Sequence, residues 1–372
     1  MVKKLKFGVL CAVFLLLSFI CQNIAPAQAY TISAAEAVFE VNSGRMLYSK
    51  NEHEKLPPAS TTKILTALII IEDCNLDDSF SIPKECAGIE GSSIYLVAGE
   101  KLTVRDLLYG LMLRSGNDCA ESLAVYHSGF VAAFSEVMNA RAVALGAEES
   151  HFVNPHGLPC EGHYTTAHDL GLIAAQALRD PVFRKIVSAR SWDIPDGGCG
   201  YARHLVNKNK MLSMYEGADG VKTGYTKQAG RCLVASSTRE NMHLVSVVLN
   251  SPSMYERSAE ILDLCYAKYS VYDLNSVSDR FFTLNTDVAK KTCRCEVETG
   301  NCLFPLTESE REEIRCEVCL PSILTLPVHA GQEVGELKIF LQNRLLFSKK
   351  IVSIENVEKS YFDVLDEVLE GF

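Results

Sequence analysis

Hydrophobic residues along this chain follow first a strand period and then a helical one. Residues 35–41 and 45–49 alternate between apolar and polar positions on either side of Asn42-Ser43-Gly44, which predicts a hairpin. From Ser60 to about Met214, apolar residues recur at the i, i+3 and i+4 spacing of an amphipathic helix. Helices are predicted over 61–72, 104–113, 120–145 and 167–178.

Strand character returns after this helical stretch. Residues 220–223, 231–238 and 243–249 read as strands, and the last two are separated by a turn at 239–242. Strands on both sides of a helical insert predict an α+β fold. One antiparallel sheet would be assembled from the two ends of the domain, with the helices packed on it.

Beyond about Val271 the pattern changes to short β-like runs. Residues 323–326 and 337–340 are examples, and a turn follows at 342–343, which predicts a second, small β-rich domain. Residues 361–372 place their apolar side chains on one face of a helix. Because the polar side is acidic, contact with a membrane surface and packing against protein remain equal alternatives.

The first residues have the composition of a targeting signal. Lysines at positions 3, 4 and 6 precede an apolar run over 7–20, and Ala27-Gln28-Ala29 provides a small-residue cleavage site. We therefore predict an exported protein that starts near Tyr30. The formal net charge of −10 argues against a nucleic-acid partner bound by a general electrostatic field.

Cysteine is frequent for an exported chain, with 14 residues in the sequence. Five of them lie close together, at positions 293, 295, 302, 316 and 319. Disulfides or free thiols are the favoured interpretation. A zinc site is the alternative, which the irregular spacing makes weaker.

A serine and a lysine one turn apart carry the first chemical signal. Ser60 and Lys63 open a long apolar helix and so share one face of it. A buried lysine with a lowered pKa can take the proton of a serine hydroxyl and make it a nucleophile. The same spacing at Ser81 and Lys84 has Pro83 inside it and no helix after it, which shows that the pair alone is weak.

Two further elements follow in a fixed order. Ser115-Gly116-Asn117 comes directly after the predicted helix over 104–113, and Lys222-Thr223-Gly224 lies on a predicted strand. Together with Ser60 and Lys63 they form the order Ser-x-x-Lys, Ser-x-Asn, Lys-Thr-Gly, which is typical of penicillin-binding proteins and β-lactamases.

The surrounding residues make the resemblance more specific. Residues 58–63, 114–118, 154–158 and 219–226 resemble the low-molecular-mass penicillin-binding proteins that are D-alanyl-D-alanine carboxypeptidases, and residues 326–335 resemble their small C-terminal domain. The resemblance implies a β-lactamase/transpeptidase-like catalytic domain. The expected units are a signal peptide over 1–29, a catalytic domain over 30–271, a β-rich domain with a Cys-rich insertion over 272–356, and an acidic helix over 357–372.

The resemblance also implies a role for each site residue. Ser60 would form an ester with peptidoglycan stem peptides ending in D-Ala-D-Ala, and β-lactams would inhibit it covalently. Lys63 would accept the serine proton, Ser115 and Lys222 would relay protons, and Asn117 would hold the substrate amide. Backbone N-H groups of Ser60 and Tyr225, beside Gly224, would form the oxyanion hole, and Thr223 and Arg257 would bind the terminal carboxylate. No metal or other cofactor is expected.

Three competing functions also fit parts of the sequence. A class A β-lactamase needs a glutamate-directed water, and the segment 148–158 lacks the loop expected to carry that glutamate. A metallopeptidase could use the histidines at 151, 156, 163 and 168, although their spacing fits no zinc signature. A wall-binding homologue without activity is the third alternative, which the intact motifs disfavour.

Overall fold

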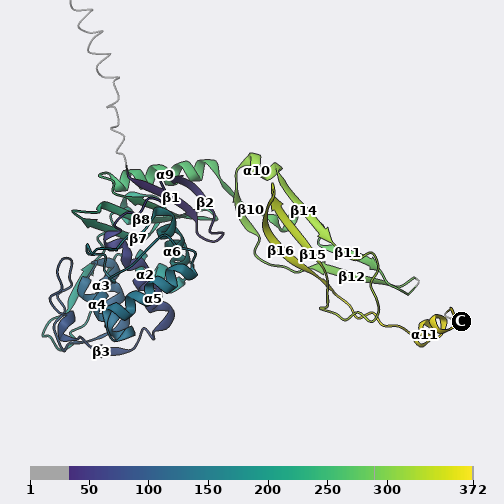
Figure 1. Cartoon of the computed structure of the whole chain (residues 1–372), viewed down its shortest axis with the longest axis horizontal. Coiled ribbons are helices and arrows are strands. Elements are labelled where there is room, and N and C mark those ends of the chain that lie inside the picture. Colours follow the sequence, from purple (N-terminus) through teal and green to yellow (C-terminus); the bar gives the residue numbers. More distant parts are fainter. Residues whose placement is uncertain (1–32, 289, 371–372) are drawn as a thin grey trace, which may run out of the picture.

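The computed structural model describes residues 33–288 and 290–370, and the predicted signal peptide lies outside them. The chain forms two lobes, a larger one with helices around a sheet and an elongated β-rich one (Figure 1). Within the described residues, no helix is long and apolar enough to cross a membrane.

One antiparallel sheet organises the larger lobe. Its strands are β1 (Ala35–Glu40), β2 (Met46–Lys50), β7 (Ala218–Thr226), β8 (Gly230–Arg239) and β9 (Met242–Leu249), in the order β2-β1-β9-β8-β7. The predicted hairpins and the joining of the N- and C-terminal strands are confirmed, because β1 pairs with both β2 and β9. Because β7 is the last strand in this order, it lies at an edge of the sheet.

Hydrophobic residues cover both faces of this sheet. Every residue of β9 is buried, and successive residues alternate between two clusters: Val245 and Val247 face one, and Leu244 and Val248 face the other. The second cluster is closed by α9 (Met254–Lys268). A strand buried on both faces explains why its sequence is almost continuously apolar.

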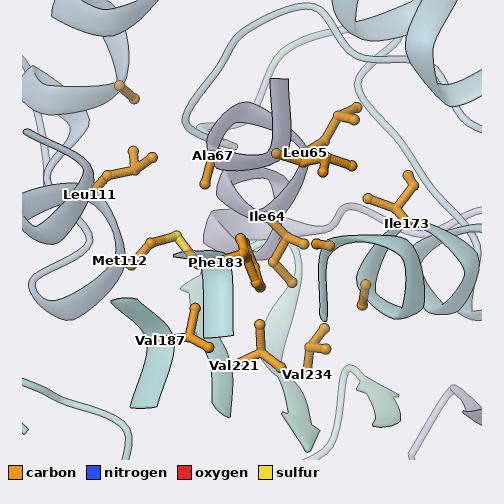
Figure 2. Close-up of a cluster of buried hydrophobic side chains, with 14 of the residues drawn as sticks. Ile64, Leu65, Ala67, Leu111, Met112, Ile173, Phe183, Val187, Val221 and Val234 are labelled. Atoms are coloured by element: carbon orange, nitrogen blue, oxygen red, sulfur yellow. The ribbon is translucent and has the colours of Figure 1, made fainter. Parts of the chain in front are cut away.

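The helices between β2 and β7 cover the other face. They are η1 (Ala59–Thr62), α2 (Lys63–Asp73), η2 (Lys84–Cys86), α3 (Val104–Leu113), α4 (Asn117–Ser128), α5 (Val131–Ala144), α6 (Ala167–Arg179), α7 (Pro181–Ser188) and α8 (Met211–Met214). Helix α2 is buried along most of its length. Figure 2 shows Phe183 of α7 among Ile64 of α2, Met112 of α3 and Val221 of β7.

One prediction for this helical stretch was wrong, and two short elements were missed. Residues 120–145 do not form one helix, because Gly129 ends α4 with a φ of 81° and a new helix begins at Val131. The stretch also contains two small hairpins, β3 (Ser79–Ser81) with β4 (Lys101–Thr103) and β5 (Ser191–Ile194) with β6 (Arg203–Val206). Strands of three or four residues are too short to produce a recognisable alternation.

The second lobe has its own core. Its elements are β10 (Ser270–Asp273), η3 (Leu274–Ser276), β11 (Phe281–Asn285), β12 (Thr292–Val297), β13 (Leu303–Leu306), α10 (Glu308–Glu312), β14 (Ile314–Cys319), β15 (Glu333–Leu341) and β16 (Arg344–Ser353). Five of them form a sheet in the order β11-β12-β16-β15-β14. The run 323–326 is not a strand, since only Leu324 forms an isolated bridge, to Thr286. Helix α11 (Tyr361–Glu370) follows.

No disulfide joins the cysteines of the described residues. All twelve in the described residues are free thiols, and the five of the Cys-rich segment divide between the core and the surface. Cys293, Cys295 and Cys302 are buried in the second core, whereas Cys316 and Cys319 are exposed on β14. Of the alternatives for the Cys-rich segment, disulfides are therefore not formed in this structure.

Arg45, in the turn between β1 and β2, connects the lobes. Its guanidinium donates to the carbonyl oxygen of Pro305 at 2.6 Å and forms an ion pair with Glu310. It also lies over the rings of Tyr269 and Phe304.

Candidate active site

Ser60 and Lys63 lie where η1 passes into α2, as the motif predicts. The Lys63 ammonium lies 3.1 Å from the Ser60 hydroxyl. The turn before Ser60 is tight, because Ala59 has a φ of 49° and the hydroxyl of Thr62 donates back to its carbonyl oxygen at 2.9 Å. Gly157 also approaches this turn so closely that a Cβ there would lie 1.8 Å from the Ala59 carbonyl oxygen.

Lys63 has the surroundings of a proton acceptor. Its side chain is fully buried, and besides Ser60 it contacts Asn117 Oδ1 and the His156 carbonyl oxygen, both at 2.7 Å. Burial holds the pKa of Lys63 well below its usual value, and the nearby charge of Lys222 lowers it further. A neutral amine in this position can donate to Asn117 and His156 while its lone pair faces the Ser60 hydroxyl.

Ser115 and Asn117 lie at the junction between α3 and α4. Ser115 has a φ of 64°, and among the described residues its buried hydroxyl has no hydrogen-bond partner. Buried hydroxyls are normally paired, so this one is available to a bound molecule. Asn117 is held inside the protein, because its Nδ2 donates to the Glu90 carbonyl oxygen at 2.6 Å.

Strand β7 forms the opposite wall of the site. Lys222 is buried, and its ammonium donates to the Thr223 carbonyl oxygen at 3.0 Å. Burial lowers the pKa of Lys222 to about 7, with a smaller contribution from the positive charge of Lys208. At Gly224 the strand approaches the nucleophile, since a Cβ there would lie 3.1 Å from the backbone nitrogen of Ser60.

An open cleft of about 310 Å³ joins these elements, a volume within the usual range of small-molecule sites. The predicted residues that line it are Ser60, Ser115, Thr223, Gly224 and Tyr225. Lys63, Asn117 and Lys222 lie behind this surface, each less than 4% exposed.

Arg257 is not brought into the cleft, contrary to its predicted role. Its guanidinium forms a two-pronged ion pair with Glu36, at 2.8 and 2.7 Å, and a third contact with Glu260 at 2.7 Å. The Glu36 side chain is fully buried. This arrangement joins α9 to β1. The guanidinium is therefore paired within the protein, on the face of the sheet that α9 covers.

Arg231 and Lys208 line the cleft and were missed from the sequence. Arg231 pairs with Tyr225 across the β7–β8 hairpin, and among the described residues its guanidinium forms no ion pair. The tight connection after Lys222-Thr223-Gly224 could have indicated this pairing. Lys208 comes from the loop before α8, where no local pattern places it.

Histidines in the segment 151–168 have separate partners rather than a common centre. The contacts are His151 Nδ1 with the Gly162 carbonyl oxygen, His156 Nε2 with Glu121 Oε1, His163 Nε2 with Thr62 Oγ1, and His168 Nδ1 with Asp169 Oδ1, at 2.7, 3.2, 2.9 and 3.0 Å. Two of them, His156 and His163, support the segments around Ser60 and Lys63.

The chain is similar to known proteins along most of its length. Residues 22–253 match the family model described as D-alanyl-D-alanine carboxypeptidase, and residues 299–359 match that of the penicillin-binding protein 5 C-terminal domain. The D-alanyl-D-alanine carboxypeptidase DacF of Bacillus subtilis is 30% identical over 372 residues, which cover 97% of this chain and 95% of the relative.

Solved structures agree with this similarity. Penicillin-binding protein 5 of Haemophilus influenzae is 25% identical with a TM-score of 0.72, covering 91% of this chain and 100% of the other. The D-alanyl-D-alanine carboxypeptidase DacD of Francisella tularensis is 26% identical with a TM-score of 0.66, covering 91% of this chain and 96% of the other.

Proposed function

This chain belongs to the D-alanyl-D-alanine carboxypeptidase family, and on that premise we propose that Ser60 removes the terminal D-alanine from peptidoglycan stem peptides. The contact of 3.1 Å between Lys63 and Ser60, at a buried amine with a lowered pKa, is the observation that carries this proposal. β-Lactams would acylate the same hydroxyl and act as inhibitors.

The reaction proceeds in two steps. Lys63 accepts the Ser60 hydroxyl proton as the oxygen attacks the carbonyl carbon of the penultimate D-alanine. Backbone N-H groups of Ser60 and Tyr225 stabilise the resulting oxyanion. When the C–N bond breaks, the proton passes through the hydroxyl of Ser115 to the departing amine, and D-alanine leaves. Water then attacks the ester carbonyl carbon while Lys63 accepts its proton, and when the ester C–O bond breaks Lys63 returns that proton to the Ser60 oxygen.

The substrate is oriented by strand β7 and its neighbour. An edge strand can pair its free backbone groups with an extended peptide, which places the peptide across Ser60. Thr223 and Arg231 would bind the terminal carboxylate, and Lys222 would keep this part of the cleft positive. In this assignment Arg231 takes the role that the family resemblance implied for Arg257, which is already paired with Glu36.

We place the enzyme at the extracytoplasmic face of the cell membrane or in the cell wall. The composition of residues 1–29 supports export. Residues 30–271 would form the catalytic domain, 272–356 the β-rich domain and 357–372 the terminal helix. Exposed Tyr361 and Phe362 at the start of α11 support peripheral contact with a membrane surface.

Release of D-alanine from a peptide ending in D-Ala-D-Ala tests the proposal. Ser60→Ala should reduce release by about 10⁴-fold or more and abolish labelling by penicillin, because the nucleophile is lost. Ser81→Ala is the matched control, since Ser81 begins the second Ser-x-x-Lys sequence but lies on β3. That variant should keep both activities.

Three results would contradict the proposal. Rapid hydrolysis of penicillin by Ser60 would indicate a β-lactamase. Peptide hydrolysis that persists in Ser60→Ala and stops with a chelator would indicate a metallopeptidase. Absence of both D-alanine release and penicillin labelling in the parent protein would indicate a wall-binding homologue without activity.

A further inference from the structure

Three side chains of the types that can ligate metals meet on the larger lobe at a place that the proposed reaction does not use. His53 lies in the turn after β2, Glu149 lies in the loop after α5, and His168 lies in the first turn of α6. Their ligand atoms all lie within 4.8 Å of one another. His53 Nδ1 is 2.5 Å from Glu149 Oε2, and the rings of His53 and His168 are 5.0 Å apart.

A buried carboxylate holds two of these residues in place. Asp169, 1% exposed, accepts the backbone N-H of Glu149 at 2.8 Å through one oxygen and contacts His168 Nδ1 at 3.0 Å through the other. The backbone N-H of His168 also donates to the Glu52 carbonyl oxygen at 2.9 Å, which fixes the turn that carries His53. A carboxylate bonded to the second nitrogen of a ligating imidazole is a common feature of zinc sites.

We propose that His53, Glu149 and His168 bind one Zn²⁺ ion, which would hold their three segments together. Two imidazoles and one carboxylate form a ligand set that zinc accepts, and a water molecule can complete the tetrahedron because the His53 side chain is 57% exposed. The carboxylates of Glu52, Glu149 and Asp169 also give this region a negative charge, which favours a cation.

The site would connect two segments that support the nucleophile. The turn with His53 leads to Ser60, and the loop with Glu149 leads to His156, whose carbonyl oxygen accepts from Lys63 at 2.7 Å. The two segments already touch once, where Leu56 bridges to Thr165. An ion held by His53, Glu149 and His168 would be a second connection between these segments and would stiffen both. This role does not depend on which reaction Ser60 carries out.

Calorimetric titration of the metal-free full chain with Zn²⁺ tests the site. The parent protein should bind one equivalent more than His53→Ala, Glu149→Gln and His168→Ala, with a Kd below about 10 μM. Saturating Zn²⁺ should raise Tm by about 5–10 °C in the parent protein at 100 times Kd. The three variants should lose this increase while keeping their circular dichroism spectra.

Two controls separate this site from other zinc ligands. His204→Ala removes an exposed histidine, paired with Asp193 at 2.6 Å, and should change neither stoichiometry nor the rise in Tm. Replacing Cys316 and Cys319 by serine removes the two exposed thiols of the second lobe and should leave the additional equivalent in place. Equal stoichiometry in the parent protein and the three site variants would overturn the proposal and leave His53 and Glu149 as an ordinary ion pair.

Discussion

At the residue scale, two arginines of the larger lobe differ in what surrounds their guanidinium groups. Arg257 is held by Glu36, which is fully buried and has no access to water. Arg231 lines the cleft beside Thr223 and, within the described residues, forms no ion pair. A charge that already has a buried counter-charge cannot bind a substrate anion without breaking that pair, whereas the other guanidinium can.

Replacing each arginine by glutamine should therefore affect a different property of the protein. Arg231→Gln should lower kcat/KM for a peptide with a free terminal carboxylate by about 10- to 100-fold, because hydrogen bonds to charged groups contribute about 1.5–3 kcal/mol. The same peptide with an amidated end should be affected much less. Hydrolysis of the two peptides by purified variants measures this ratio.

Arg257→Gln serves as the matched comparison. It should leave the ratio unchanged and lower the free energy of unfolding by about 3–5 kcal/mol, since Glu36 would lose its buried partner. Denaturant unfolding measures this loss. If the ratio of kcat/KM between the two peptides changed in Arg257→Gln and stayed the same in Arg231→Gln, Arg257 would be the residue that binds the carboxylate.

Residues joined by local geometry could be predicted from their spacing, whereas distant residues could be predicted only where a resemblance to known motifs supplied them. Ser60 and Lys63 are one helical turn apart, so their contact follows from the sequence spacing. Arg257 is separated from Glu36 by 221 residues, and no local pattern reveals that pairing. Predicting the role of a surface arginine requires knowing which acid the fold brings to it.

At the element scale, the active site depends on how closely strand β7 packs against the turn before Ser60. Gly224 permits this approach, because a Cβ would lie 3.1 Å from Ala59 Cβ, the Pro58 carbonyl oxygen and the Ser60 nitrogen. Such contacts are tighter than most, so a larger residue would move the strand and the turn apart. The same element also supplies one proposed oxyanion N-H, that of Tyr225.

Gly224→Ala should consequently slow acylation of Ser60 by penicillin by about 10- to 100-fold, since small displacements of reacting groups are costly. Gly300→Ala is the matched control, because a Cβ there meets no atom within 4 Å. Its acylation rate should equal that of the parent protein. Stopped-flow labelling gives both rates, and an unchanged rate in Gly224→Ala would show that the approach does not matter.

Elements were predicted best where the periodic pattern extends over many residues. The five-stranded sheet and most helices followed from alternation and i, i+4 spacing, whereas the hairpins β3–β4 and β5–β6 were missed. The prediction of one helix over 120–145 failed at Gly129, where a single glycine outweighed a continuous helical period. Backbone conformation at such a residue is decided by packing on both sides, which periodicity does not record.

At the scale of the whole molecule, the two lobes have separate hydrophobic cores joined near Arg45. The residues named as lining the cleft all precede β10, so the second lobe contributes none of them. Arg45 contacts Pro305, Glu310 and Phe304 of that lobe. These contacts should fix the orientation of the two lobes relative to each other without affecting the reaction at Ser60.

Arg45→Ala should leave kcat/KM for a soluble peptide within about twofold of the parent value. It should increase cleavage by proteases between the lobes, because a junction held by few contacts opens more readily. Arg294→Ala, which breaks an exposed ion pair with Glu355 inside the second lobe, is the control and should change neither property. A tenfold loss of activity in Arg45→Ala would show that the lobes communicate.

Separate cores also affect how the two parts can vary over generations. A substitution in the β-rich lobe is tolerated if that lobe still folds and still makes its external contacts. The chemistry at Ser60 places no further limit on it. The larger lobe is restricted by the close fit of Ala59, Gly157 and Gly224 around one hydroxyl. A lineage could therefore adapt the distal lobe to a new cell surface while inheriting the catalyst unchanged.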